Sequence, residues 1–176
     1  QYLWLPMAHV FGTVLIVLQV ESGMTTAVDG RVPKIMENCA VIKPTFMGAA
    51  PRIFEKAHGR IVTMQATEGG AKEKIFNKAF EVGLKVDQLK REGKPVPTVL
   101  GLQHKVFDKL VFHKIRDRFG GRVRFFISGA AALNRDIAEW FNAAGIIILE
   151  GYGLSETSPV ASFTTVPSSG GAPLRV

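Results

Sequence analysis

The sequence predicts an α/β fold built from parallel-sheet βαβ layers. Segments with strand character alternate along the chain with segments of helical periodicity, and this alternation is typical of parallel sheets. Residues 123–150 show it most compactly, because a strand, a helix and a second strand follow one another there. The second strand, Ile146–Leu149, is continuously apolar and breaks into Gly151-Tyr152-Gly153. That pattern indicates a buried parallel strand ending at a ligand-binding turn.

The first part of the chain predicts short strands separated by helices. The strand-like segments are Tyr2–Pro6, Thr25–Val28 and Thr45–Gly48. The helical segments are Phe11–Ser22, which ends near Gly23, then Val32–Val41, which stops before Pro44, and a third that begins at Pro51 and runs through Met64. Proline suits the first turn of a helix because its missing N–H has no partner there.

The second part predicts two long helices and then the compact βαβ unit. The helices are Ala71–Glu92 and Val99–Phe119, joined by Gly93–Pro97. An apolar stripe at intervals of three and four runs along the second helix, and it comprises Phe107, Leu110, Val111, Ile115 and Phe119. In the βαβ unit, Val123–Ile127 is the first strand, Asn134 is placed to cap the helix, and Gly145 ends it.

The carboxyl ends of these strands are expected at one edge of a sheet, since βαβ crossovers make neighbouring strands parallel. Open α/β sheets bind ligands at that edge. Four turns of small residues would then line one cleft, although they lie far apart in the sequence: Met7–His9, Gly48–Pro51, Ser128–Ala132 and Gly151–Gly153.

Length and composition fit one domain in a reducing compartment. The 176 residues, 47% of them apolar, are enough for one core. The single cysteine, Cys39, excludes an internal disulfide framework and is expected as a core-facing thiol. The apolar run Val10–Val20 is too short to span a bilayer. Because Gln1 begins within strand-like sequence and Val176 follows no closing element, we expect a piece of a larger protein.

Basic residues are concentrated in the middle of the chain. The net charge is +7, yet residues 52–124 alone hold 17 Lys or Arg against eight Asp or Glu. Their helical spacing among acids favours solvated helix faces, and attraction to an anionic membrane or a polyanionic ligand is the alternative. Binding to nucleic acid is not expected, because no basic motif interleaved with aromatic residues is present.

The last two turns carry groups suited to a nucleotide. The backbone from Gly129 to Ala132 lets a planar base approach, and Tyr152 offers a ring for stacking. Ser155 can donate to a phosphate oxygen, and Glu156 can bind Mg²⁺, which favours carboxylate, phosphate and water oxygens. The structural alternative is that these segments are ordinary tight turns and that Glu156 caps a helix.

The string Glu150–Pro159 resembles the signature of the adenylate-forming superfamily, which includes acyl-CoA synthetases, adenylation domains of peptide synthetases and luciferases. Their common pattern is Tyr-Gly-x-Thr-Glu, and Ser155 keeps the hydroxyl of the usual Thr. Trp4–Gly12 is similar to the superfamily's Leu-Pro-x-x-His segment, and Phe126–Leu133 is similar to its adenine-contacting turn.

Pro51–Lys56 and the long helical stretch before Val123 are typical of the long-chain fatty acyl-CoA synthetase branch. The resemblance implies that residues 1–176 form a single incomplete domain, part of the AMP-binding N-terminal domain of an adenylate-forming enzyme. Residues 52–122 would be a helical insert within it.

The same resemblance implies roles for individual residues. Glu156 would bind the Mg²⁺ on ATP, Ser155 would contact the α-phosphate, and His9 would lie near the fatty acid carboxylate and that phosphate. These three are the implied catalytic residues. The implied ATP- or AMP-binding residues are Gly129, Ala130, Ala131, Glu150, Gly151, Tyr152, Gly153, Leu154 and Ser155. The implied acyl-binding residues are Val10, Gly12, Gly48 and Ala49.

The implied reaction joins a long-chain fatty acid to ATP, giving acyl-AMP and pyrophosphate, after which the CoA thiol takes the acyl group and releases AMP. ATP and Mg²⁺ are therefore expected, with CoA as co-substrate. The protein is expected in the cytoplasm, and peripheral contact with the inner face of the membrane stays open. The sequence indicates neither the preferred acyl chain length nor the oligomeric state.

Two other functions stay open. One is a fatty acyl-AMP ligase that delivers its acyl group to a carrier protein, and the other is a non-catalytic α/β module that binds a nucleotide. The family's phosphate loop is expected before Gln1, and its ribose-binding Asp and catalytic Lys after Val176. We therefore expect that this chain alone does not catalyse acyl activation.

Overall fold

A computed structural model of the chain describes residues 1–157 and 160–164. Its main sheet has the strand order β3-β4-β5-β6. The strands are β3 (Phe46–Ala49), β4 (Phe125–Ser128), β5 (Ile148–Tyr152) and β6 (Ser162–Phe163). The first three are parallel, with Ala49 opposite Ser128 and Ser128 opposite Glu150. The predicted parallel α/β fold is therefore confirmed.

The last two strands correct one prediction. We expected Gly151-Tyr152-Gly153 to be a turn after a strand that ends at Leu149, but β5 continues through Tyr152. The strand continues because β6 pairs with it in antiparallel fashion, with Gly151 opposite Phe163. A two-residue strand is too short to show a hydropathy period, so the sequence did not predict β6. The turn begins only at Gly153.

The N-terminal strand is also shorter and placed differently than expected. β1 (Tyr2–Leu3) pairs in parallel with β2 (Ala27–Val28) in a separate two-stranded sheet. Within the described residues it is not a strand of the main sheet, so the expectation of a fourth strand at that edge is wrong. The indole N–H of Trp4 instead donates to the Gly48 carbonyl at 2.9 Å. A side chain thus joins the two sheets where we expected main-chain pairing.

Helices fill the connections between the strands, near the predicted positions. They are α1 (Val10–Ser22), η1 (Val32–Lys34), α2 (Ile35–Ile42), α3 (Pro51–Glu68), α4 (Gly70–Arg91), α5 (Thr98–Phe107), η2 (Asp108–Phe112), α6 (His113–Arg118), α7 (Arg135–Ala143) and η3 (Ser155–Thr157). The side chain of Asn134 accepts from the N–H groups of Asp136 and Ile137, so the predicted N-cap is confirmed.

The helix expected over Val99–Phe119 is interrupted by a π-helical turn, η2, between α5 and α6. A π turn takes more residues than an α turn, so it rotates the following side chains relative to an α-helical pattern. Leu110, predicted to lie on the buried stripe, is 51% exposed, whereas Phe112 is fully buried. Val111, Ile115 and Phe119 are buried as predicted.

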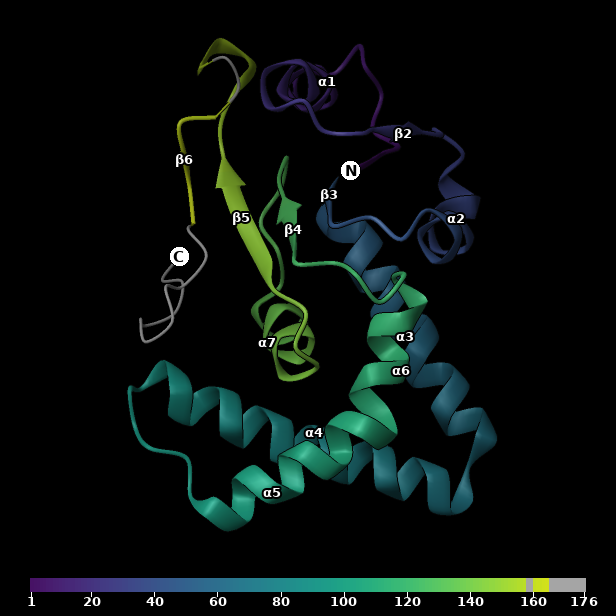
Figure 1. Cartoon of the computed structure of the whole chain (residues 1–176), viewed down its shortest axis with the longest axis vertical. Helices are drawn as coiled ribbons and strands as arrows, with labels where there is room; N and C mark the ends of the chain where they lie inside the picture. The colour runs from purple at the N-terminus through teal and green to yellow at the C-terminus, as the bar shows by residue number, and fades with distance from the viewer. Residues whose placement is uncertain (158–159, 165–176) are drawn as a thin grey trace.

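The main sheet lies between two apolar layers, and β4 contributes to both. Phe126 packs edge-to-face on Phe54 of α3 and on Phe119, in the larger core cluster. Phe125 and Ile127, which point to the other face, pack with the smaller cluster around Leu15 of α1. Figure 1 shows α1 and the β1–β2 pair at one end of the molecule and α4 and α5 at the other.

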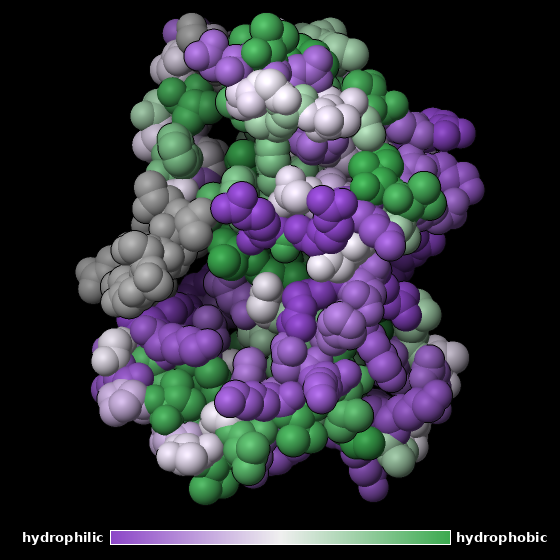
Figure 2. All heavy atoms as spheres, in the orientation of Figure 1, coloured by the Kyte–Doolittle hydropathy of each residue, from purple (hydrophilic) through white to green (hydrophobic). Residues whose placement is uncertain are grey.

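The face of the helical region between β3 and β4 that Figure 2 presents carries many hydrophilic side chains. Figure 2 shows hydrophilic side chains spread over the face where Figure 1 places α4–α6. None of the helices formed by residues 1–157 and 160–164 combines the length and apolar character needed to cross a bilayer.

Cys39 is fully buried in the larger core cluster, as expected for a packing thiol. Burial raises the pKa of Cys39 to about 12. We expect the native thiol to resist Ellman's reagent at pH 8 and to react once the chain is unfolded, because only the thiolate attacks.

The raised pKa also predicts how stability depends on pH. The unfolded thiol ionises near pH 8.5, so the stabilising contribution of the neutral buried form is complete below that pH and is lost as the pH rises toward 12. Urea unfolding of the native chain should show this decline, and Cys39→Ala should show a shallower one. If the free energy of unfolding falls equally steeply with pH in both proteins, the raised pKa of Cys39 is contradicted.

Candidate functional site

The carboxyl edge of the main sheet brings three of the four predicted small-residue segments together. The N–H of Gly129 donates to the carbonyl of Ala49 at 3.3 Å, across β4 and β3. A Cβ placed on Gly129 would lie 3.7 Å from the carbonyl oxygen of Gly151 in β5. Small residues at or beside the ends of three strands therefore lie side by side.

The first turn of α1 covers two of these strand ends. The ring of Phe11 lies 3.1 Å from the Cβ position of Gly48 and 3.3 Å from that of Gly129. His9 caps the same helix, because its Nδ1 accepts from the Phe11 N–H at 3.2 Å. An imidazole that accepts at Nδ1 carries its proton at Nε2 when neutral. The exposed His9 ring thus keeps one N–H for another partner.

The end of β4 and the turn after it hold two features that the sequence did not predict. Ala130 has a φ of 71°, which a residue with a Cβ rarely adopts and which costs about 1–2 kcal/mol. Ser128 is 1% exposed, and its hydroxyl has no hydrogen-bond partner among the described residues. No sequence signal marks the strained Ala130. The sequence analysis placed Ser128 in the predicted turn Ser128–Ala132 but assigned no role to its hydroxyl.

The segment from Tyr152 to Glu156 projects beyond the sheet edge. Tyr152 is 66% exposed at the end of β5. The short helix η3 is held by the N–H of Leu154, which donates to the Thr157 hydroxyl at 2.9 Å. Ser155 and Glu156 lie in η3 and are both exposed. The last two residues of the predicted signature, Ser158 and Pro159, lie outside the described residues.

The main chain of Glu150, upstream of this segment, is held on its other side. Its N–H donates to the Thr164 hydroxyl at 2.7 Å, and its carbonyl accepts from the Thr164 N–H at 2.9 Å. The β5–β6 pairing therefore fixes the direction in which Tyr152 and the residues after it leave the sheet.

The residues expected to bind the acyl chain are closely packed. A Cβ on Gly12 would lie 2.3 Å from the carbonyl oxygen of Pro6, and one on Gly48 would lie 2.5 Å from Leu15. Ala49 is fully buried and Val10 is half-buried. Of these residues, Gly48 lies against α1, Gly12 lies against the Pro6 backbone, and Ala49 belongs to the larger core cluster on the other face of the sheet, and their acyl role stays a prediction.

Glu156 is suited to share a metal ion with a ligand. Mg²⁺ is usually held by one or two carboxylates together with substrate phosphates and water. The exposed Glu156 side chain has no ion pair within the described residues, so it is free to contribute in that way. No group of three or more His, Cys, Asp or Glu in that part of the chain could hold a metal ion alone.

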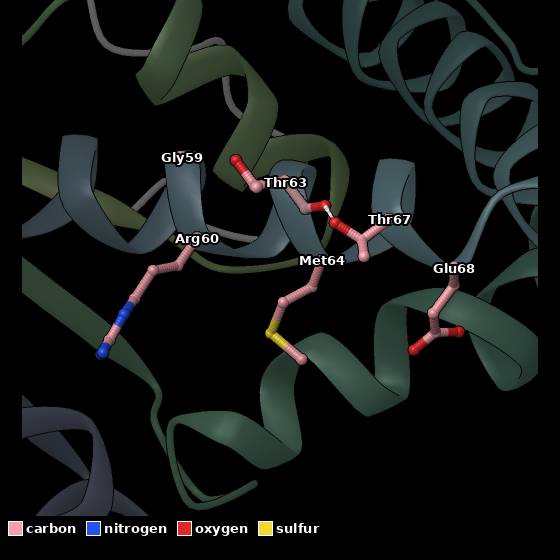
Figure 3. A pocket seen from close by; sticks show the side chains of 6 residues that line it. All are labelled: Gly59, Arg60, Thr63, Met64, Thr67 and Glu68. Carbon is pink, nitrogen blue, oxygen red and sulfur yellow. Dashed lines mark hydrogen bonds between the residues drawn. The ribbon is translucent and has the colours of Figure 1, made fainter.

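An open depression on α3 lies away from this edge. Its volume is about 510 Å³, and it is lined by Gly59, Arg60, Thr63, Met64, Thr67 and Glu68. Figure 3 shows Arg60, Met64 and Glu68 extending from the same side of α3. It contains none of the predicted site residues, so the candidate site rests on the sheet edge.

Sequence comparison relates the chain to a large family of enzymes. A model of the AMP-binding enzyme family matches residues 1–175. The chain is 34% identical over 161 residues to "Long chain acyl-CoA synthetase 6, peroxisomal" of Arabidopsis thaliana, covering 90% of this chain and 22% of that protein. It is also 34% identical to "Long-chain-fatty-acid--CoA ligase FadD15" of Mycobacterium tuberculosis, covering 88% and 25%. The chain thus spans about a quarter or less of these relatives.

Solved structures share the fold. The adenylation domain of a carboxylate reductase from Mycobacterium chelonae superposes with a TM-score of 0.60 at 19% identity, over 86% of this chain and 20% of that one. The A-PCP didomain of carboxylic acid reductase from Segniliparus rugosus, solved with AMP, gives 0.56 at 20% identity, over 90% and 18%. The described fold is therefore that of part of an adenylation domain. Together with the match over residues 1–175, this places the chain in the AMP-binding enzyme family.

Proposed function

We propose that this chain forms part of a long-chain fatty acid–CoA ligase, which activates a fatty acid with ATP and passes it to CoA. The observation that carries the proposal is the sheet edge where Ala49, Gly129 and Gly151 meet. Beside it, the exposed segment from Tyr152 to Glu156 offers a ring, a hydroxyl and a carboxylate. Membership of the AMP-binding enzyme family and 34% identity to long-chain acyl-CoA synthetases support this substrate class.

In the proposed complex, the adenine lies against the backbone of Gly129, Ala130 and Ala131 and stacks on Tyr152. The main chain from Glu150 to Leu154 borders the nucleotide. Close approach is favoured because the strand ends beneath it carry few side-chain atoms.

The phosphates lie beyond the base, over η3. The Ser155 hydroxyl donates to an α-phosphate oxygen, and the Glu156 carboxylate binds Mg²⁺. Bound Mg²⁺ offsets negative charge on the phosphate oxygens. One fatty acid carboxylate oxygen forms a bond to the α-phosphorus as the bond to pyrophosphate breaks, giving acyl-AMP. The His9 Nε2–H, left free by the N-cap contact, donates to the carboxylate or to the α-phosphate.

The acyl chain is proposed to run along α1, past Val10, Gly12, Gly48 and Ala49. In the second step the CoA sulfur bonds to the acyl carbon, the thiol loses its proton, and AMP leaves. Catalysis of this kind depends chiefly on positioning and on electrostatic stabilisation of the phosphates.

We further propose that residues 1–176 are one incomplete domain of the whole enzyme, with residues 52–122 as a helical insert. The whole enzyme would be cytoplasmic, with peripheral contact with anionic membrane. The basic excess of residues 52–124 supports that contact.

The test is fatty-acid-dependent exchange between ATP and pyrophosphate. The full-length enzyme should catalyse it with long-chain substrates, whereas the purified 176-residue chain should not, because the phosphate loop and catalytic Lys implied by the family lie outside it. Exchange by the 176-residue chain would contradict the proposal that catalysis needs residues outside it. Absence of exchange in the full-length protein would favour a non-catalytic nucleotide-binding module.

The acyl acceptor is tested separately. CoA and a holo-carrier protein are added separately to the full-length enzyme with its acyl-AMP, and only the addition of CoA should consume the acyl-AMP, giving acyl-CoA and AMP. Transfer to the carrier protein alone would identify a fatty acyl-AMP ligase instead.

A further inference from the structure

The outer face of α5 and η2 carries a row of exposed apolar side chains. Val99, Leu102, Val106 and Leu110 are between 50% and 71% exposed. Their spacing of three and four residues places them on one side of the helix, over about 16 Å at 1.5 Å per residue. An exposed apolar row of this length is typical of an interaction surface.

The other side of the same helix makes the contacts with the protein. Phe107 packs against the larger core cluster, and Phe112 is fully buried in it. The His104 ring lies 5.7 Å from the Phe112 ring. Asp108 forms an ion pair with Arg116 at 2.7 Å. The helix is thus anchored by its inner side, and the apolar row faces outward.

Unpaired lysines accompany the apolar row. Lys105, Lys109 and Lys114 are exposed and form no ion pair within the described residues. Asp108 is the one acidic residue in the sequence from position 98 to 114, and Arg116 neutralises it. The surface is therefore apolar along its centre and positive beside it.

The neighbouring helix α4 lacks such an apolar row, because its most exposed large apolar side chains are Ile75 at 44% and Leu84 at 36%. Lys72 pairs with Glu68, and Lys78 and Lys85 both pair with Glu81. These three lysines are paired with acids at helical spacing, as on an ordinary solvated surface, whereas Lys74 and Lys90 form no ion pair within the described residues. Figure 2 shows hydrophobic atoms gathered at the end of the molecule where Figure 1 places α5, next to hydrophilic side chains.

We propose that this face, the α5 surface, docks on an anionic lipid membrane. Val99, Leu102, Val106 and Leu110 would enter the boundary between headgroups and acyl chains, while the lysine stems extend their ammonium groups to the lipid phosphates. Charge favours lipid over a second copy of the chain, because two copies paired through this face would bring their lysines together. The proposal rests on the membrane contact proposed above, but not on acyl activation.

Co-sedimentation of the purified 176-residue chain with lipid vesicles tests the proposal. The vesicles are phosphatidylcholine alone or an equal mixture with phosphatidylglycerol. The unaltered chain should bind the anionic vesicles and bind neutral ones weakly. The apolar variant Leu102→Ser/Val106→Ser and the charge variant Lys105→Glu/Lys109→Glu should each bind anionic vesicles at least about tenfold more weakly.

Matched variants away from the α5 surface serve as controls. Val20→Ser/Val41→Ser changes two side chains that are 80% and 82% exposed, and Lys34→Glu/Lys43→Glu makes the same charge change at two exposed lysines outside residues 52–124. Both controls should bind like the unaltered chain, and circular dichroism verifies that every variant is folded. All altered positions are exposed, so at least one α5 variant is expected to fold.

Three results would overturn the proposal. The first is that the unaltered chain does not bind anionic vesicles, the second is that the α5 variants and the controls bind equally, and the third is that the unaltered chain self-associates in solution in a way that the α5 variants abolish. The second result would leave membrane contact in place and assign it to another surface. None of these measurements needs ATP, so they are independent of the exchange assay.

Discussion

Replacing Glu156 with alanine in the full-length enzyme is expected to lower fatty-acid-dependent ATP–pyrophosphate exchange by about a hundredfold or more. The exposed carboxylate of Glu156 has no ion pair within the described residues, so its loss should remove a metal ligand and leave the fold intact. The concentration of Mg²⁺ needed for half-maximal exchange should rise. Glu156→Gln, which keeps the shape but loses the charge, should behave similarly.

A suitable control is Glu21→Ala, which removes an exposed carboxylate near the end of α1, remote from the sheet edge. Its exchange rate and Mg²⁺ dependence should match those of the unaltered enzyme. The metal assignment fails if Glu156→Ala retains full exchange with the original Mg²⁺ dependence.

Gly120→Ala is expected to destabilise the fold by about 3 kcal/mol or more. Gly120 follows α6 with a φ of 93°, and a Cβ there would lie 2.5 Å from the carbonyl oxygen of Cys39 and 2.7 Å from the Cα of Lys43. Backbone cannot move aside as a flexible side chain can, so conformational strain and overpacking add. Thermal unfolding should shift down by roughly 10 °C in a chain of this size.

Two other glycines separate these contributions. Gly93 has a φ of 67° with open space around its Cβ position, so Gly93→Ala should cost only the conformational strain, about 1 kcal/mol. Gly59 lies inside α3, again with open space, and Gly59→Ala should stabilise the helix by about 0.5–1 kcal/mol. If Gly120→Ala and Gly93→Ala lower the free energy of unfolding equally, the close contact of the Gly120 Cβ position with Cys39 and Lys43 does not contribute to the loss of stability.

The parallel fold was predictable because its signals are local. Asn134 caps α7 through its own side chain, and an apolar run marks β5. The π turn before α6 was not predictable from a helical period, since Leu110 continues the apolar stripe in the sequence yet faces outward. The separation of β1 from the main sheet depends on the contact between Trp4 and Gly48, 44 positions apart, which no local pattern reveals.

The site was predictable in its parts more than in its geometry. The sequence placed Gly48, Gly129 and Gly151 at strand ends, and the structure brings them together. It assigned Gly151 to a turn, because the pairing of β5 with a two-residue partner leaves no periodic signal. The left-handed Ala130 was not predictable either, since alanine normally avoids that conformation.

The ring of Phe11 in α1 packs against Gly48 in β3 and against Gly129 in the turn after β4. It lies 3.3 Å from the Cβ position of residue 129 and 3.1 Å from that of residue 48, where Leu15 is closer still at 2.5 Å, so residue 11 limits the size of residue 129 and shares with Leu15 the limit on residue 48. A larger residue in either strand would require a smaller one in α1. The sizes of the residues at these three positions should therefore vary together rather than independently among related sequences.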